Sequence, residues 1–339
     1  MFFYNKYFTV FFLLSAVFAC TVKNADSDTG FLVVIPPGFD SMDVPADNQL
    51  TEARITLGKR LFFDPILSGN YSVSCATCHR PEFAFADNKK LSTGASGKEG
   101  KANTPSLANV GYIENLMKEG GVHTLEIQVV APVEEHAEMN LDINEAVERI
   151  KKKPVYLWMS FKAYGRKPDH YVVTRALSAF ERTLVSGNSV YDRWINNGEG
   201  VSAEIKRGKD LFFSDSLACA SCHSGFLFTS QEFENNGLYD TFPGNGRERI
   251  THTTEDIGKF RVPSLRNVDV TAPYMHDGSL STLRDVISHY ASGGKNHPNK
   301  SEKIKGFQLS EGDMQALEAF LLSLTDEDFL KNPNFRVKK

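Results

Sequence analysis

Apolar residues recur at helical spacing in three segments of the chain, and each segment begins with a residue that can cap a helix. The capping residues are Thr51, Ser202 and Ser310, the last of which resembles a capping box with Asp313. The apolar positions are Ile55, Leu57, Leu61 and Phe62 in the first segment, Ile205 and Leu211 in the second, and Met314, Leu317, Phe320, Leu321 and Leu324 in the third. Strand-like alternation is confined to short pieces such as 31–35. The pattern predicts a mostly α-helical protein.

The same pattern occurs twice along the chain. The segment 58–64 (GKRLFFD) matches 208–214 (GKDLFFS), and 105–110 (PSLANV) matches 263–268 (PSLRNV). The second match has an offset of 158 residues, and this offset also pairs Met117 with Met275 and Thr124 with Thr282. One register held over about twenty positions indicates an internal duplication. We therefore expect two related domains, 41–190 and 191–339.

Composition and charge narrow the class of protein. The 339 residues are 41% hydrophobic and 24% charged, as in ordinary globular proteins. The formal net charge is −4, and the longest basic run is only 151–153, which argues against a nucleic-acid partner. Segments 91–101, 238–254 and 293–303 are rich in glycine and charge, and we expect long loops there, which often lie over a functional site.

The first residues indicate export. Lys6 precedes an apolar run, 8–19, that is too short to span a bilayer and predicts a signal peptide over 1–19. The run ends in VFAC, which resembles a bacterial lipobox, so we expect a lipidated Cys20, a tether over 20–40 and a periplasmic location. The alternative is a plain secretory signal cut nearby. No other stretch approaches ~18 apolar residues, so membrane contact is expected only through Cys20.

Four of the five cysteines lie in two CxxCH motifs. These are Cys75, Cys78 and His79 in the first motif, and Cys219, Cys222 and His223 in the second. Two thiols three residues apart, followed by imidazole, suit the two vinyl groups of a haem and supply an axial ligand to its iron. A zinc site or a redox dithiol would not need histidine directly after both pairs. The motifs predict two covalently bound haem c groups.

On these motifs the chain resembles the bacterial dihaem cytochrome c peroxidase and MauG family. The resemblance also rests on LFFD at 61–64, NTPSL at 103–107, RTLVSG at 182–187 and APYMHDG at 272–278. It implies two cytochrome c-like haem domains. The N-terminal haem would meet hydrogen peroxide, and the C-terminal haem would pass on electrons from a small cytochrome c or cupredoxin. The resemblance also allows a homodimer.

The family pattern assigns residues to the N-terminal haem. Gln128 and Glu138 keep the family's ten-residue spacing, which implies that Glu138 moves protons while Gln128 orients peroxide. Ala95 occupies the position where a typical peroxidase has a histidine that blocks the resting iron. We therefore expect the first iron to be five-coordinate or bound to water, as in the MauG branch.

The second haem and a metal ion are assigned in the same way. Tyr290 matches the position of the second iron's distal ligand, which is methionine in typical members, while Met275 and His289 are rival ligands. The family also has one Ca²⁺ between its domains. Its ligands match the Asn103 side chain and the backbone carbonyls of Thr271 and Pro273, with waters completing the shell.

One departure from the family bears on function. Lys118 lies where members usually have a tryptophan between the haems, which disfavours long-range oxidation of a protein substrate. Three functions stay open: a hydrogen peroxide reductase, a MauG-like oxidase of a partner protein, and a non-enzymatic dihaem electron carrier. The carrier predicts two six-coordinate low-spin haems, whereas both enzymes predict one high-spin ferric haem.

Overall fold

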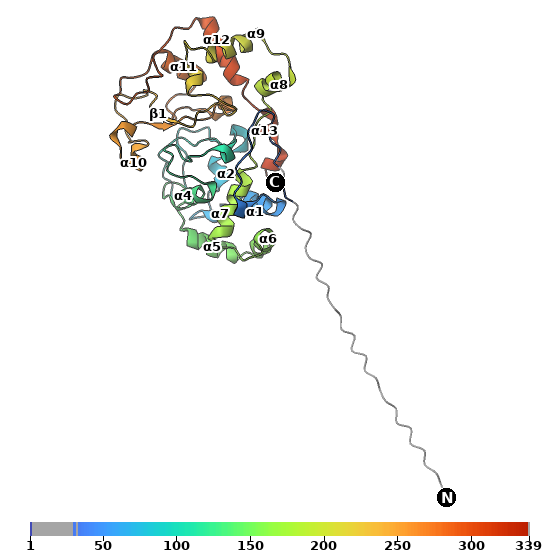
Figure 1. The fold of residues 1–339 in the computed structure, drawn as a ribbon. Coiled ribbons are helices and arrows are strands. Elements are labelled where there is room, and N and C mark those ends of the chain that lie inside the picture. The colour runs from blue at the N-terminus through green and yellow to red at the C-terminus, as the bar shows by residue number, and fades with distance from the viewer. Residues whose placement is uncertain (2–29, 32, 338–339) are drawn as a thin grey trace.

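The computed structural model describes residues 1, 30–31 and 33–337, so the predicted signal peptide and Cys20 lie outside the described residues. Its α-helices are α1 Glu52–Phe63, α2 Cys75–Cys78, α3 Leu125–Gln128, α4 Val130–Glu134, α5 Ile143–Lys151, α6 Pro154–Tyr164, α7 His170–Glu181, α8 Val190–Asn197, α9 Ala203–Phe212, α10 Glu248–Thr251, α11 Leu283–Ala291, α12 Glu311–Leu322 and α13 Glu327–Lys331 (Figure 1). Strands β1 Phe233–Glu234 and β2 Phe260–Arg261 pair antiparallel. None of the described helices has the length and apolarity needed to cross a bilayer.

The three helices predicted from periodicity are α1, α9 and α12. Their caps form as expected, because the hydroxyls of Thr51, Ser202 and Ser310 each accept a hydrogen bond from the backbone amide three residues later. The prediction of a mostly helical protein is confirmed. The segment 238–254 is not wholly a loop as expected, because α10 forms within it.

The duplication is visible as two equivalent helix crossings. Helix α1 packs on α7, and α9 packs on α12. A Cβ on Gly58 would lie 1.8 Å from the carbonyl oxygen of Ala176, and a Cβ on Gly208 would lie 1.9 Å from that of Ala316. Only glycine permits such an approach of one helix to another helix's backbone. The two glycines of the repeated sequence therefore fix the same crossing in both halves.

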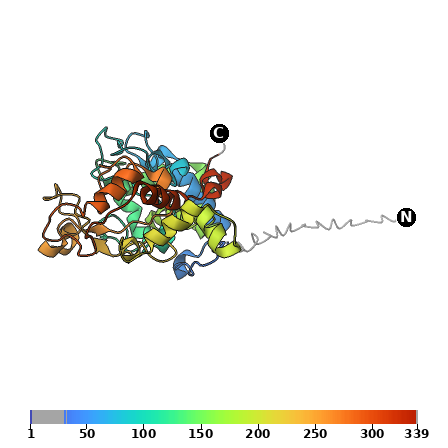
Figure 2. The same ribbon diagram turned by 90° about the horizontal axis from the view of Figure 1, so that it is seen from above.

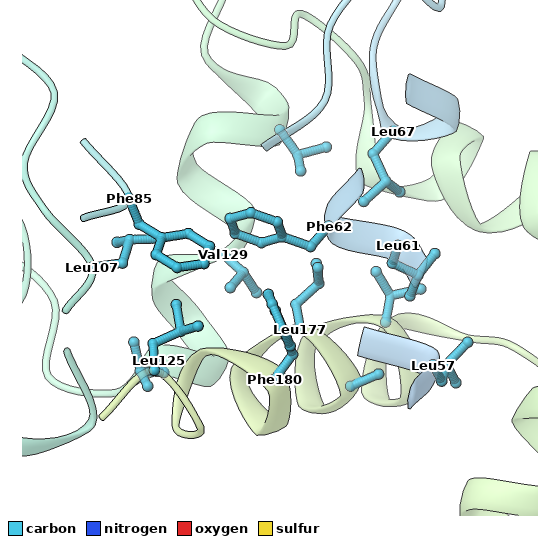
Figure 3. Packing of buried hydrophobic residues seen from close by; sticks show 14 of the residues in the cluster. Leu57, Leu61, Phe62, Leu67, Phe85, Leu107, Leu125, Val129, Leu177 and Phe180 are labelled. Atoms are coloured by element: carbon cyan, nitrogen blue, oxygen red, sulfur yellow. The ribbon is translucent and has the colours of Figure 1, made fainter. Parts of the chain in front are cut away.

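Each crossing is covered by its own aromatic core. Figure 3 shows the first core, in which Phe62 packs against Phe180 with ring centroids 5.1 Å apart. In the second core Phe212 packs against Phe320 at 5.0 Å. Burial of such side chains contributes about 1.5–3 kcal/mol each. We call the two halves the first and second modules.

The two modules are joined through a buried polar link. Asn109 and Asn267 occupy equivalent positions, and both have left-handed backbones, with φ of 61° and 59°. The Asn109 side chain donates to the carbonyl oxygen of Ser186 (2.9 Å), and the Asn267 side chain donates to the Ser186 hydroxyl (2.9 Å). The connecting segment is therefore held by the same residue of each repeat.

The last helix returns to the first module. Phe329, Leu330 and Phe335 belong to the first core, where the rings of Phe329 and Phe335 lie 5.9 and 6.0 Å from that of Phe85. Figures 1 and 2 show α13 near the label C, set apart from α12. The proposed second domain, 191–339, thus includes a segment that completes the core of the first.

Candidate active site

The first CxxCH motif forms one turn of helix. Helix α2 includes both thiols, Cys75 and Cys78, and Ser74 with Thr77 forms a capping box at its start. The Nδ1 atom of His79 lies 2.7 Å from the carbonyl oxygen of Phe85. A carbonyl can only accept, so Nδ1–H donates and Nε2 keeps its lone pair for a metal. Burial lowers the pKa of His79, which favours the neutral ring that can ligate iron.

The second motif repeats this arrangement with a shorter turn. A 3₁₀ turn spans Cys219–Ser221, and His223 follows it. The Nδ1 atom of His223 lies 3.1 Å from the carbonyl oxygen of Phe228, and burial lowers the pKa of the ring. Both histidines therefore present Nε2 as a possible ligand.

Both motifs line one cavity of about 1040 Å³, which is slightly larger than the ~300–1,000 Å³ typical of ligand sites. All four cysteines of the motifs are free thiols and lie in its wall with both histidines. Covalent attachment of haem needs unpaired thiols, a neutral imidazole and a large cavity. The residues present therefore fit two haem c groups.

The cavity wall also includes Gln128 and Glu138 near the first motif. Gln128 ends α3, and its side-chain amide has only a long contact, 3.7 Å, with the sulfur of Met117. Glu138 also lines the cavity, and the pKa of its carboxyl is raised by partial loss of solvent around it and by the nearby Glu135, while Lys101 acts in the opposite direction. The structure thus brings both predicted residues to the cavity, with a weakly held amide and a carboxyl that forms no ion pair with another described residue.

The loop that contains Ala95 is hydrogen-bonded to the segment that contains Glu138. The backbone amide of Ala95 donates to the carbonyl oxygen of Glu138 (2.6 Å), and the Ser96 hydroxyl donates to that of His136 (2.7 Å). A Cβ on Gly94 would lie only 2.2 Å from the carbonyl oxygen of Ala137, so glycine is required for this contact. Position 95 therefore offers a methyl group and no ligand atom.

Tyr290 lies in the cavity wall beside the second motif. Helix α11 begins at the capping box of Thr282 and Asp285, and Tyr290 lies near its end. Burial raises the pKa of Tyr290 to about 12, and the nearby Cys219 and Cys222 act in the same direction. Without a cation the phenol is therefore neutral, and a ferric iron would be needed to stabilise its anion.

Asn236 contacts all three candidate ligands and was missed by the sequence analysis. Its side-chain amide donates to the sulfur of Met275 (3.2 Å), its backbone carbonyl oxygen accepts from Nε2 of His289 (3.0 Å), and its side chain lies near the Tyr290 phenol, whose pKa it acts to lower. Met275 and Tyr290 line the cavity, whereas His289 does not. The geometry favours Tyr290 over His289, and no periodicity or motif marks Asn236 in the sequence.

Asn103, Thr271 and Pro273 all line the cavity, and the backbone amide of Asn103 donates to the carbonyl oxygen of His276 in the second module (3.0 Å). The side-chain nitrogen of Asn103 donates to the carbonyl oxygen of Lys89 (3.0 Å), which leaves its oxygen as the remaining ligand atom. No cluster of three or more His, Cys, Asp or Glu side chains that could hold a metal occurs among the described residues. Calcium binding by these three residues stays a prediction.

Lys118 lies between the modules. Its pKa is lowered to about 8, chiefly by burial and then by Arg261. Beside it, His276 stacks on Phe260 with ring centroids 4.0 Å apart, and burial lowers the pKa of His276 to about 4. The two stacked rings beside Lys118 therefore both come from the second module, while the first module contributes a cation.

Two acidic groups are buried on helices of the first module, Glu126 on α3 and Glu181 on α7. The Glu126 carboxylate accepts from Arg182 (2.6 and 3.1 Å), Ser178 and Asn48, and although burial opposes ionisation, these bonds lower its pKa to about 2. Glu181 lines the cavity, one of its oxygens has no hydrogen-bond partner, and burial raises its pKa to about 8. Sequence reasoning identified neither residue.

Comparisons with known proteins agree with this architecture. Residues 52–200 match the family model of the di-haem cytochrome c peroxidases, and 205–325 match that of cytochrome c. The chain is 37% identical over 322 residues to the methylamine utilization protein MauG of Methylorubrum extorquens, covering 92% of this chain and 91% of that protein. It is 34% identical to the cytochrome-c peroxidase IdrP1 of Denitromonas iodatirespirans, covering 92% of both.

Solved structures show the same fold. A MauG-like protein associated with microbial copper homeostasis superposes with a TM-score of 0.87 at 32% identity, covering 91% of this chain and 99% of that one. The diheme peroxidase BthA of Burkholderia thailandensis superposes with a TM-score of 0.74 at 21% identity, covering 90% of this chain and 99% of that one. At this identity the similarity supports the fold alone. With two repeated modules, two CxxCH motifs on one cavity and relatives along most of its length, the chain belongs to the di-haem cytochrome c peroxidase and MauG family.

Proposed function

We propose that this protein reduces hydrogen peroxide to water, taking two electrons and two protons per peroxide from a small cytochrome c or cupredoxin and from solvent. The observation that carries the proposal is that Gln128 and Glu138 line the cavity near the first CxxCH motif with no strong partner of their own. When bound, the haems would supply iron centres that exchange electrons, held by His79 and His223 with Tyr290 as a further ligand of the second iron.

Glu138 is proposed to move the protons. Its raised pKa brings the carboxyl closer to neutral pH, where a group can both accept and return a proton. Gln128 can donate from its amide to a peroxide oxygen and hold it in place. The neighbouring Glu135 keeps the pKa of Glu138 raised by charge repulsion.

The proposed electron entry is the second module. Its motif shares the cavity with the first, so the two haem groups would lie within one protein-enclosed space. Tyr290 would favour high oxidation states of the second iron, because phenolate is a hard anion. Ala95 supports an open first iron, since it offers no ligand atom and its loop is bound to the Glu138 segment.

Oxidation of a partner protein is the second candidate. It is favoured by Ala95 and Tyr290, and the MauG of Methylorubrum extorquens is among the similar proteins. It is disfavoured by Lys118, a cation at the junction where an aromatic ring would serve as a relay. We rank peroxide reduction first for this reason.

Further parts of the proposal concern export, a calcium ion and the division into domains. The signal peptide over 1–19, the lipidated Cys20 and the periplasmic location follow from sequence and from the export that c-type haem attachment requires. A Ca²⁺ at Asn103, Thr271 and Pro273 would hold the loops between the modules. The domain division 41–190 and 191–339 is proposed with the exception of α13.

Three measurements test the proposed function. The electron paramagnetic resonance spectrum of the fully ferric holoprotein should contain one high-spin and one low-spin signal, and a pyridine haemochrome assay should give two haems per chain. Peroxide should then be consumed with stoichiometric oxidation of a reduced cytochrome c or cupredoxin. Two low-spin signals without peroxide consumption would assign the protein as an electron carrier, whereas peroxide reactivity without oxidation of any small donor would favour the MauG-like candidate.

A further inference from the structure

Helix α6 exposes an apolar surface that no other described part of the chain covers. Its side chains at successive turns, Val155, Trp158 and Phe161, are 38%, 63% and 50% exposed. Tyr156, Met159 and Ala163 are buried on its opposite side, against the first core. The exposed residues are therefore not needed to hold the helix in place. Large exposed aromatic side chains at helical spacing mark a surface that contacts a partner.

Cations surround this surface. The segment 151–167 contains six Lys and Arg residues and no Asp or Glu, although the whole chain has a formal net charge of −4. Lys152, Lys153, Lys162 and Lys167 are exposed, and none of them forms an ion pair with another described residue. The ammonium group of Lys162 lies 5.5 Å from the ring centroid of Trp158, so charge and aromatic surface coincide. We call Val155, Trp158, Phe161 and these four lysines the α6 face.

The described chain begins at the same end of the molecule. The backbone amide of Phe31 donates to the carbonyl oxygen of Leu50 (2.8 Å), directly before α1. From the first turn of α1, Arg54 donates to the carbonyl oxygen of Ala163 in α6 (3.2 Å) and lies over the ring of Tyr164. Figure 1 shows α1 and α6 side by side. Twenty-nine residues precede Gly30 in the sequence, and Gly30 itself pairs with Thr51, the residue that caps α1.

We propose that the α6 face lies on an anionic lipid bilayer. Tryptophan and phenylalanine prefer the boundary between headgroups and acyl chains, and lysines beside them are attracted to anionic headgroups. A second copy of the chain fits less well, because a symmetric contact would bring two sets of lysines together. The proposal is independent of peroxide reduction. It adds a protein surface to the membrane contact predicted through Cys20.

Vesicle flotation of the holoprotein tests the proposal. Cys20→Ser removes the predicted lipid anchor, and the haem absorbance reports protein in the vesicle fraction. We expect the Cys20→Ser protein to float with vesicles of phosphatidylcholine and phosphatidylglycerol but not with phosphatidylcholine alone, and to be released by salt. Lys152→Ala and Lys153→Ala should each weaken binding about fivefold, and Trp158→Ser with Phe161→Ser should abolish it.

Matched control variants distinguish binding through the α6 face from nonspecific adsorption of the protein to vesicles. Ile195→Ser changes an equally exposed apolar residue on α8, and Lys206→Ala removes an exposed lysine on α9, so neither should change flotation. If the Cys20→Ser protein floats with neither type of vesicle, or if the Trp158 and Phe161 substitutions leave flotation unchanged, the proposal is wrong. A Trp158-dependent dimer in size-exclusion chromatography would instead assign the α6 face to a second copy, and Trp158-dependent binding of an acidic redox protein without flotation would assign it to that partner.

Discussion

The backbone amide of Asn103 donates a hydrogen bond to the carbonyl oxygen of His276 (3.0 Å). With the offset of 158 residues between the repeats, Arg261 is the position equivalent to Asn103, and His276 is the position equivalent to Lys118. The equivalent bond is also present, because the backbone amide of Arg261 donates to the carbonyl oxygen of Lys118 (2.8 Å). The two modules thus exchange the same bond, as the subunits of a twofold dimer do. The contact is self-complementary, so the junction is an internal version of a symmetric interface.

Glu138→Gln should slow peroxide consumption by roughly 10²–10⁴ without loss of haem, because general acid–base groups contribute that much. The rate is measured with excess reduced donor, and haem content by its absorbance. Glu134→Gln, on the exposed side of α4, is the control and should retain activity. A loss below about threefold for Glu138→Gln would show that this carboxyl does not transfer the proton.

The fully ferric protein should react with stoichiometric peroxide without prior reduction, because position 95 offers no ligand to close the first site. A haem absorbance change on stopped-flow mixing is the measurement. Ala95→His should remove the high-spin signal and slow this reaction, while Ala95→Gln, of similar size, should do neither. Inert ferric protein that half-reduction activates would contradict the open site.

Tyr290→Phe should change the spectrum of the second haem and leave the signal of the first unaltered. Asn236→Leu should produce a smaller change in the same haem, because it removes a polar side chain near Tyr290 that favours the ionised phenol, while the phenol itself stays. His289→Gln is the control, since His289 lies outside the cavity wall. A normal second-haem spectrum in Tyr290→Phe would point to Met275.

Arg182→Leu should lower the free energy of unfolding by about 3–5 kcal/mol, because it leaves the buried Glu126 carboxylate without its cation. The same change should slow peroxide consumption, since Glu126 and Gln128 lie on the four-residue helix α3. Urea unfolding followed by circular dichroism measures the first effect. Asp47→Asn breaks the more exposed pair with Arg175 and should cost less than about 1 kcal/mol.

Glu181→Gln should flatten the dependence of stability on pH. The folded protein holds the Glu181 proton up to about pH 8, whereas the ordinary pKa is 4.5. The native state therefore binds more protons than the unfolded state between these values, and stability falls as pH rises through that window. Thermal midpoints of the variant and the parent should diverge in the variant's favour toward pH 8. Parallel curves would show that Glu181 is ionised in the folded holoprotein.

Local chemistry made much of the fold predictable. Thr51, Ser202 and Ser310 cap helices through contacts three residues away, so the sequence contains the whole interaction. The CxxCH motifs are equally local. Helix α7 was not predicted as the partner of α1, because their crossing depends on Gly58 meeting Ala176, more than a hundred positions away.

The residues of the candidate site also divide into those that the sequence could predict and those that it could not. Gln128, Glu138 and Tyr290 could be selected from spacing within a known family pattern, and the structure places all three at one cavity. Asn236 and Glu181 could not be selected, because their importance comes from what surrounds them in space. Asn236 is one polar residue in a loop, and Glu181 is one acid on a helix whose cavity-facing side only the folded chain defines.

The return of α13 to the first core sets the order in which the two modules can be completed during synthesis. Phe329, Leu330 and Phe335 fill the core around Phe85, so the first module keeps an apolar gap until almost the whole chain has emerged. Domains made early in synthesis usually fold before the later ones are complete. Here the module that is translated first is the last to complete its core. A premature stop codon after α12 would therefore destabilise the first module, although the missing residues lie at the other end of the sequence.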